Sequence, residues 1–274
     1  MFVVLSVTAA QARAQQANAA APTSAAQAGA SDDDASLDLI EPDFVVVNLP
    51  TTLRLPVHRG NFHLSHRFNL NLREGDFGTL ADNLFGLDNG ANIGLEFRLG
   101  IARHLEAVVQ RTSVGQTIQF SAKYDAWHQS ATNPLSISAI VSVEGDRNFR
   151  DNHAPALGAV VSRKVADRLA VYATPFWVHH TDTGGATTLN TSFVGIGARI
   201  RIATTTYLLG EVSPRLGGFV IGDPEYAFAI EKRVGAHVFS LTFANGPATT
   251  FRQLAQGGQP DRLYLGFNLT RKFF

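Results

Sequence analysis

The chain has 274 residues, its 23 Lys and Arg are matched by 23 Asp and Glu, and only 17% of its residues are charged. This balance provides no basic surface for nucleic acid, so a nucleic-acid partner is not expected. The lack of any cysteine excludes disulfides, thiolate catalysis, thiolate-bound metals and attached haem.

The first residues have features of an export signal. Phe2–Val7 is a short apolar run, and Ala12, Arg13 and Ala14 form a small-x-small site of the kind that signal peptidase cleaves. The positively charged region that normally precedes the run is missing. We therefore predict that residues 1–14 are a truncated signal peptide whose true start lies upstream; an ordinary apolar N-terminus is the alternative.

The next two segments differ from the rest of the chain. Residues 15–42 are rich in Ala, Gln and Ser and include the acidic run Ser31–Asp34, which predicts a disordered linker. Residues 43–57 are apolar but are broken by proline. They form either an additional edge strand or a segment folded into the interior, and the pattern leaves both open.

Apolar and polar residues alternate from Asn61 onward. In the stretch NIGLEFRLGI, Leu95 and Phe97 occupy one face of a strand, and Glu96 and Arg98 occupy the other. Twelve segments carry this pattern, at 61–71, 91–100, 105–113, 117–126, 135–144, 156–164, 168–178, 192–202, 206–215, 225–234, 237–245 and 262–273.

The connections between these segments alternate in length. If both chain ends lie on one side of a membrane, all the long connections fall on the opposite side, and only 114–116 is short there. Strands of about ten residues in an even number with such asymmetry are typical of outer-membrane barrels. We predict an all-β fold, a transmembrane antiparallel up-and-down β-barrel of about 12 strands over residues 43–274, after a disordered N-terminal segment. A soluble β-sandwich or soluble barrel is the alternative, because its strands also alternate.

The last strand ends on Phe273 and Phe274. A terminal phenylalanine is the signal that bacterial barrel-assembly machinery recognises in proteins of this class, so we predict that these two residues form an assembly signal. The expected partners are that machinery and the lipid of the outer membrane of a Gram-negative bacterium. The oligomeric state is left open.

Short motifs in the first third of the barrel also suggest a family. These are His66–Phe68, Phe85–Asp88, Asn92–Phe97, Arg111–Ser113 and Lys123–Tyr124. With them the chain resembles an uncharacterised family of bacterial outer-membrane β-barrel domains, of the membrane-bound type and of unknown function. The resemblance implies an outer-membrane barrel and brings no reaction, ligand or catalytic residue.

The polar faces of the strands define the predicted lumen. The side chains expected to line it are Arg67, Glu96, Arg98, Glu106, Gln110, Lys123, Asp125, Glu144, Arg199, Arg201, Glu211, Glu231 and Arg233. Both signs of charge occur, which favours small polar or zwitterionic solutes over selection for ions of one sign. The sequence therefore predicts a small channel for passive passage of small polar solutes; a non-conducting barrel that anchors a partner is the alternative.

A lipid-modifying enzyme is a third hypothesis, because twelve-stranded outer-membrane phospholipases place a His and a Ser two residues apart on one strand. Here His63 and Ser65 share the polar face, so the pair should point into the lumen and away from lipid. The neighbouring histidines His179 and His180 lack a convincing set of metal ligands. No catalytic residue, metal site or cofactor is predicted.

One far loop, 72–90, contains the stretch NLFGLDNG. It forms either a helical turn packed over or into the pore or an ordinary surface loop. If it constricts the pore, deleting it should raise the conductance.

Overall fold

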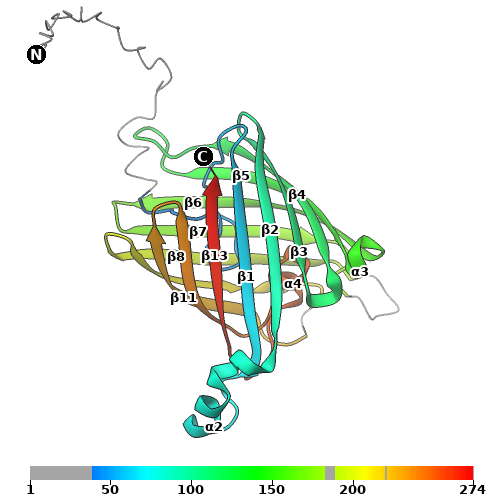
Figure 1. Ribbon diagram of the computed structural model, residues 1–274. Helices are drawn as coiled ribbons and strands as arrows, with labels where there is room; N and C mark the ends of the chain where they lie inside the picture. The colour runs from blue at the N-terminus through cyan, green and yellow to red at the C-terminus, as the bar shows by residue number, and fades with distance from the viewer. Residues whose placement is uncertain (1–38, 183–188, 220, 274) are drawn as a thin grey trace, which may run out of the picture.

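Figure 1 shows the computed structural model, which describes residues 39–182, 189–219 and 221–273 as a closed β-barrel. These residues form a sheet of thirteen strands, of which β10 has only three residues and pairs with β8. The strands are β1 (Gly60–Asn71), β2 (Ala91–Ala102), β3 (Leu105–Thr112), β4 (Ile118–Trp127), β5 (Ser136–Gly145), β6 (Asp151–Val165), β7 (Leu169–Val178), β8 (Thr191–Ala203), β9 (Thr206–Ser213), β10 (Arg215–Gly217), β11 (Glu225–Val234), β12 (His237–Ala244) and β13 (Tyr264–Phe273).

The twelve long strands confirm the predicted barrel. Every neighbouring pair is antiparallel, and the ring closes where β1 pairs with β13. Closure is what a spanning sheet requires, because an open edge would leave unpaired backbone groups in hydrocarbon. The predicted strand bounds hold to within two or three residues except at β6, which begins at Asp151 instead of 156. The predicted loop 145–155 is thus mostly the extended end of a hairpin around α3 (Asp146–Phe149).

The two ends of the barrel differ as the loop lengths predicted. We call the end where β1 begins and β13 finishes the near side, and the opposite end the far side. Most near-side turns are short, such as 103–104 and 235–236, and 128–135 is the longest there, whereas the far side carries 72–90 and 245–263. The far-side loops also hold the short helices, which are α2 (Phe77–Asp82), η1 (Leu84–Asn89), η2 (Val114–Gln116), α3 and α4 (Phe251–Gln256).

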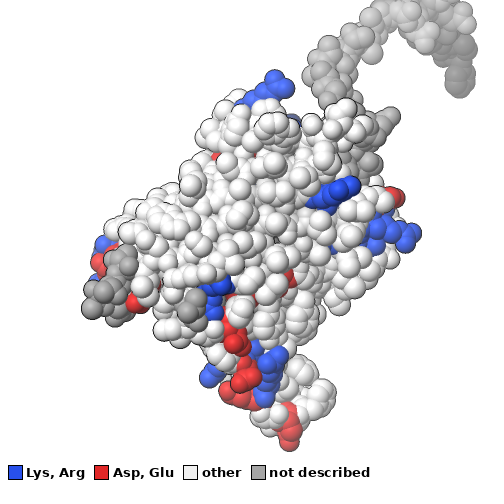
Figure 2. All heavy atoms as spheres, turned by 180° about the vertical axis from the view of Figure 1, so that it is seen from behind, with Lys and Arg blue, Asp and Glu red and all other residues white. Residues whose placement is uncertain are grey.

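The outer wall is apolar. Leu95 on β2, Leu157 on β6 and Ile230 on β11 are 44%, 58% and 50% exposed, although they are large aliphatic side chains. Figure 2 shows a broad face largely free of charge, with Lys, Arg, Asp and Glu gathered toward the two ends. This is the surface expected of a barrel surrounded by lipid. Within the described residues, no helix is long and apolar enough to cross a membrane.

The interior is filled by two segments that enter from opposite sides. Residues 39–57, the N-terminal plug, fold into the barrel from the near side, and most of their side chains are buried. Residues 245–263, the loop plug, fold inward from the far side and carry the buried helix α4. Of the two options for 43–57, the structure therefore selects the internal one.

Two predictions need correction. The linker predicted at 15–42 lies mostly outside the described residues, but its last four residues belong to the N-terminal plug, because Glu41 pairs with Lys164 in the interior. Loop 72–90 does not constrict the pore: α2 projects away from the barrel, and Phe77 on it is 74% exposed. The surface-loop alternative holds there because η1 packs against the outside of β1, where Gly86 meets Leu70.

Candidate functional site: the lumen and its two plugs

The N-terminal plug is a narrow hairpin. A bridge between Val45 and Pro50 joins its two arms, and the Val46 N–H donates to the Leu49 carbonyl at 2.8 Å. The tip of the plug is therefore the turn at residues 46–49. Both arms return to the near side, where the second arm leads into β1. In the described part of the chain, the hairpin pairs with no strand of the barrel sheet, and its one bridge joins its own two arms.

The tip is held by polar groups of the wall. The Glu211 carboxylate accepts from the backbone N–H groups of Val47, Asn48 and Leu49 at 2.9, 2.8 and 3.1 Å. The amide of Asn268 donates to the Val47 carbonyl at 2.8 Å. Hydrogen bonds to a charged partner are the stronger kind, so Glu211 is the principal anchor of the tip.

The arms of the hairpin are bound in the same manner nearer to the rim. Glu41 forms an ion pair with Lys164 at 2.9 Å, and Asp43 accepts from the Thr270 hydroxyl at 2.8 Å. The guanidinium of Arg199 donates to the Val45 carbonyl at 2.7 Å. The wall thus satisfies both main-chain and side-chain groups of the plug, as buried polar groups require.

The loop plug is organised by α4. Thr250 and Gln253 form a capping box that begins the helix. Arg252 then reaches the wall at the far rim, where its Nε lies 3.2 Å from Glu144 Oε1 and its Nη2 pairs with Asp146. One arginine therefore fastens the inserted helix to the hairpin between β5 and β6.

Asp146 lies in the far-side loop, outside the spanning segments. Partial burial acts to raise the pKa of its carboxyl, but hydrogen bonds from Asn152, Thr117 and Arg252, with the charge of Arg252, outweigh burial and hold the pKa below the ordinary 3.8. The carboxylate is therefore charged over the physiological range, and the ion pair with Arg252 persists there.

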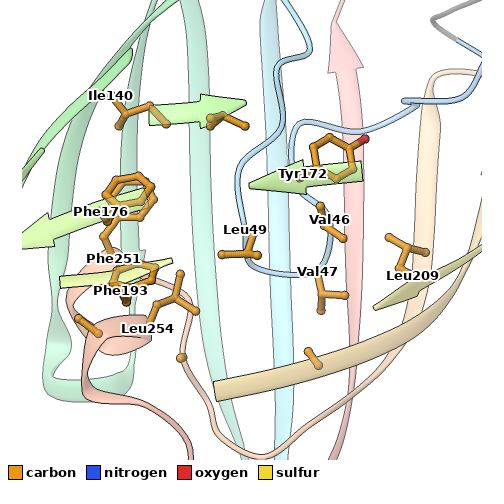
Figure 3. Packing of buried hydrophobic residues seen from close by; sticks show 14 of the residues in the cluster. Val46, Val47, Leu49, Ile140, Tyr172, Phe176, Phe193, Leu209, Phe251 and Leu254 are labelled. Atoms are coloured by element: carbon orange, nitrogen blue, oxygen red, sulfur yellow. The ribbon is translucent and has the colours of Figure 1, made fainter. Parts of the chain in front are cut away.

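An apolar cluster joins both plugs to one half of the wall. Figure 3 shows Val46, Val47 and Leu49 of the N-terminal plug, Phe251 and Leu254 of the loop plug, and side chains of the wall. The rings of Phe176 and Phe251 stack with centroids 4.3 Å apart.

A glycine of the wall makes room for the tip. A Cβ placed on Gly195 would lie 2.5 Å from a methyl of Leu49. The lack of a side chain on β8 at this position therefore creates the recess in which Leu49 lies.

The other half of the wall carries a network of charges on β2, β3 and β4. Arg98 pairs with Glu96 at 2.8 Å and with Glu106, while Lys123 lies 3.4 Å from Glu106 and 3.6 Å from Asp125. All five side chains are less than a tenth exposed. The network contains two cations and three acids, so both signs of charge lie within a few ångströms of each other.

The residues predicted to line the lumen fall into two groups. Most are buried on the inner wall, namely Arg67, Glu96, Arg98, Glu106, Gln110, Lys123, Asp125, Glu144, Arg199, Glu211 and Glu231. Arg201 and Arg233 lie at the near-side rim and are partly exposed; Arg201 pairs there with Asp167 at 3.3 Å. Phe273 is 43% exposed on β13 and pairs with Gly60, whereas Phe274 lies outside the described residues. Their role in assembly stays a prediction.

Two cavities lie between the plugs and the wall. A cavity of about 30 Å³ touches Asn48 and Pro50 of the N-terminal plug and Thr249 and Phe251 of the loop plug. A second cavity, of about 120 Å³, lies toward the far side beside Arg67. The first volume is on the scale of single water molecules, so the two plugs leave no room there for a larger solute.

The histidine and serine of the enzyme hypothesis both face the lumen. His63 Nδ1 lies 2.8 Å from the Thr270 hydroxyl, and Ser65 is buried opposite Asn268. His66 points outward and stacks on Phe267, with centroids 4.8 Å apart. Neither His63 nor Ser65 is therefore placed where a membrane lipid would meet it.

His179 and His180 lie at the start of a far-side loop. His179 Nδ1 lies 2.6 Å from Asn190 Oδ1, and His180 Nδ1 lies 3.3 Å from the His153 carbonyl. In the part of the chain that the structure describes, no group of three or more histidine and carboxylate side chains could hold a metal ion.

Sequence reasoning left the N-terminal plug as one of two options for 43–57 and missed the loop plug. The unbroken apolar run Phe44–Val47 was a signal, because a segment without alternation is typical of burial on both faces. The spacing of Thr250 and Gln253 before an apolar residue was a second signal, typical of a helix start. Alternation alone also gave no sign that the Tyr207 hydroxyl donates to a plug carbonyl, that of Leu39, at 2.6 Å.

The closed barrel, its apolar belt and its filled interior define a membrane-spanning β-barrel protein with internal plugs. A family model described as "Membrane bound beta barrel domain (DUF5777)" matches residues 43–273, and the chain belongs to this family. The resemblance seen in the sequence is thereby confirmed, and the protein is located in the outer membrane of a Gram-negative bacterium. No protein of curated function matches the sequence.

Solved structures of similar fold include porins. The KdgM porin has a TM-score of 0.52 at 11% identity, covering 78% of this chain and 99% of its own. The KdgM porin in complex with disordered oligogalacturonate has a TM-score of 0.50 at 11% identity, with 80% and 100% covered. The NanC porin has a TM-score of 0.49 at 8% identity, with 78% and 99% covered. At these identities the two KdgM structures support the barrel fold alone.

Proposed function

We propose that the protein is a gated channel of the outer membrane for small polar solutes, closed in the described conformation by its two plugs. The observation that carries this proposal is the way the wall binds the N-terminal plug. Glu211, Asn268 and Arg199 bind main-chain groups of a separate hairpin, which belongs to none of the strand pairs of the barrel.

Withdrawal of the hairpin would leave a wall that water can hydrate. The released carboxylates, amides and guanidinium groups would exchange plug groups for water, so the net cost of opening is far smaller than the sum of the broken bonds. The short near-side turns suit the periplasmic side. The N-terminal plug would then leave toward the periplasm, and the loop plug toward the outside.

The charge network on β2 to β4 supports the choice of solute. It presents both signs within a few ångströms, as between Arg98 and Glu96 at 2.8 Å. A wall of this kind suits small polar or zwitterionic solutes, whereas a channel for acidic sugars or phosphates would be expected to carry an excess of Arg and Lys.

Single-channel recording in a planar bilayer tests the proposal, with residues 15–274 refolded to a heat-modifiable barrel. The informative variant is Leu49→Asp, which places a carboxylate in an apolar recess beside Glu211 and should expel the tip. We expect rare steps from the unaltered chain and a several-fold higher open fraction in the variant. The matched control is Leu216→Asp, at a far-side position that is 72% exposed, and it should behave like the unaltered chain.

The second candidate function is a non-conducting barrel that anchors a partner. It is favoured by the apolar cluster, because Leu49, Phe251 and Phe176 pack as a protein core does. In that case, folded barrels of both variants would show no steps, and the search would move to proteins bound by the exposed loop 72–90.

A further inference from the structure

The wall around the plug tip binds a cluster of hydrogen-bond donors. Three consecutive N–H groups of the tip, those of Val47, Asn48 and Leu49, converge on the single carboxylate of Glu211 at 2.8 to 3.1 Å. A carboxylate that gathers three donors from one direction is the partner that an ammonium group, with its three N–H donors, would satisfy in the same way.

A second carboxylate beside the tip is incompletely satisfied. Glu225 is fully buried, and its Oε1 accepts from the Asn48 side-chain amide at 2.9 Å. Among the described residues, no donor forms a hydrogen bond with Glu225 Oε2. Burying an acceptor without a partner is unfavourable, so this oxygen indicates a site that the plug fills imperfectly.

Two acidic side chains at the tip share one guanidinium. Arg67 lies beside Glu211 and Glu225 and donates to Asn48 Oδ1 at 3.0 Å and to Asn268 Oδ1 at 2.9 Å. A further cationic group would stabilise both acids as carboxylates in this buried environment, where Coulombic attraction is stronger than in water.

We infer that Glu211 and Glu225, freed by withdrawal of the tip, form a binding site for a primary ammonium group, and that the plug is the internal competitor of such a ligand. The ammonium group supplies the N–H donors that the plug supplied, a positive charge beside the two acids and a donor for Glu225 Oε2. This inference rests on the proposed function, because the site becomes accessible only when the tip leaves.

The groups of the wall that bind plug carbonyls indicate a second chemical group on the ligand, a hydrogen-bond acceptor. Asn268 donates to the Val47 carbonyl at 2.8 Å, and Arg199 donates to the Val45 carbonyl at 2.7 Å. In the open lumen these donors face a carboxylate or a peptide oxygen of the same ligand. The ligand class is therefore a small zwitterion with a primary ammonium group, such as an amino acid or a short peptide.

The test compares two cations that differ in their hydrogen-bond donors. Methylammonium carries three N–H groups, whereas tetramethylammonium carries the same charge and none. With the full chain 15–274 in a bilayer, methylammonium chloride should raise the open fraction several-fold, and equal tetramethylammonium chloride should leave it unchanged. Glu225→Gln should abolish the response, and Glu74→Gln, on an exposed far-side loop, should retain it.

Equal responses to both cations, or a methylammonium response that survives Glu225→Gln, would overturn the inference. A barrel that never conducts would contradict the channel but not the site. Hydrogen exchange at the amides of Val47, Asn48 and Leu49 separates these cases. Methylammonium should speed their exchange in the unaltered chain and not in the Glu225→Gln variant, and unchanged exchange in both would remove the site.

Discussion

Arg252 of α4 forms an ion pair with Asp146 at the far rim, although 106 residues separate the two in the chain. The same guanidinium also binds the buried carboxylate of Glu144. The loop plug is thus fastened to the far rim by one side chain that pairs with two acids.

Replacing Arg252 by glutamine should release the loop plug. The change leaves Glu144 buried without a charged partner, and breaking a buried pair typically costs about 3–5 kcal/mol. Hydrogen exchange of the α4 amides is the measurement, and it should accelerate strongly while the strand amides stay protected. The control is Arg147→Gln, which removes an exposed ion pair with Asp151. If the α4 amides stay equally protected in both variants, the ion pairs of Arg252 do not hold the loop plug in place.

The ion pair between Asp146 and Arg252, which fastens α4 to the far rim, should weaken in acid. Because the pKa of Asp146 is lower in the folded protein than its ordinary value of 3.8, its contribution to stability is fully present above that value. It is lost as the pH falls through the lowered pKa. We expect steady α4 protection from pH 7 down to about 5 and a loss below about 4. In the Asp146→Asn variant, the loss of α4 protection in acid should disappear. If the variant loses protection over the same pH range as the unaltered chain, other groups cause the loss.

Filling the recess at Gly195 should displace the tip of the N-terminal plug. In the Gly195→Val variant, the new side chain meets both the Thr174 hydroxyl on β7 and Leu49, and overpacking of this kind costs roughly 1–3 kcal/mol. Exchange at residues 44–51 should accelerate by about five- to a hundred-fold. Gly210→Val is the matched control, because a Cβ there meets no atom within 4 Å. If residues 44–51 exchange at the same rate in both variants, the recess at Gly195 does not hold Leu49 and the plug tip in place.

An arginine in the lipid-facing belt should impair folding into bilayers. Leu95→Arg places a charge in the middle of β2, which costs about 2–4 kcal/mol near the midplane of the bilayer. The yield and urea midpoint of folding into lipid vesicles should both fall. Val234→Arg, at the near-side end of β11, should cost only about 0–1 kcal/mol, and a similar loss in both variants would contradict the assigned membrane depth.

The alternation of residues predicted the barrel well because lipid imposes it. Every outward side chain meets the same medium, so Leu95 and Ile230 are apolar for the same reason and the strand pattern is readable. The inner face obeys no such single rule. Glu211 would be equally polar facing water or facing the backbone of a plug, so the pattern on β9 could not distinguish a pore from a filled lumen.

The contacts that decide the site also join distant parts of the chain. Glu211 lies 164 residues from Val47, and no local pattern encodes their meeting. Loop 72–90 and loop 245–263 are equally long, and the sequence suggested a constriction only for the first. What places the second inside the barrel is the bond of Arg252 to Glu144, which only the folded chain brings together.

The most direct test of the gated channel is a reversible lock on the N-terminal plug. A Cβ at Gly197 would lie 3.3 Å from one methyl of Val46, which suits a disulfide between Val46→Cys and Gly197→Cys. The chain has no other cysteine, so these two thiols pair only with each other within one molecule. Single-channel recording of this variant should show no steps when it is oxidised and repeated steps after reduction. Steps of equal frequency in both states, from barrels shown to be folded and cross-linked, would contradict gating by the plug.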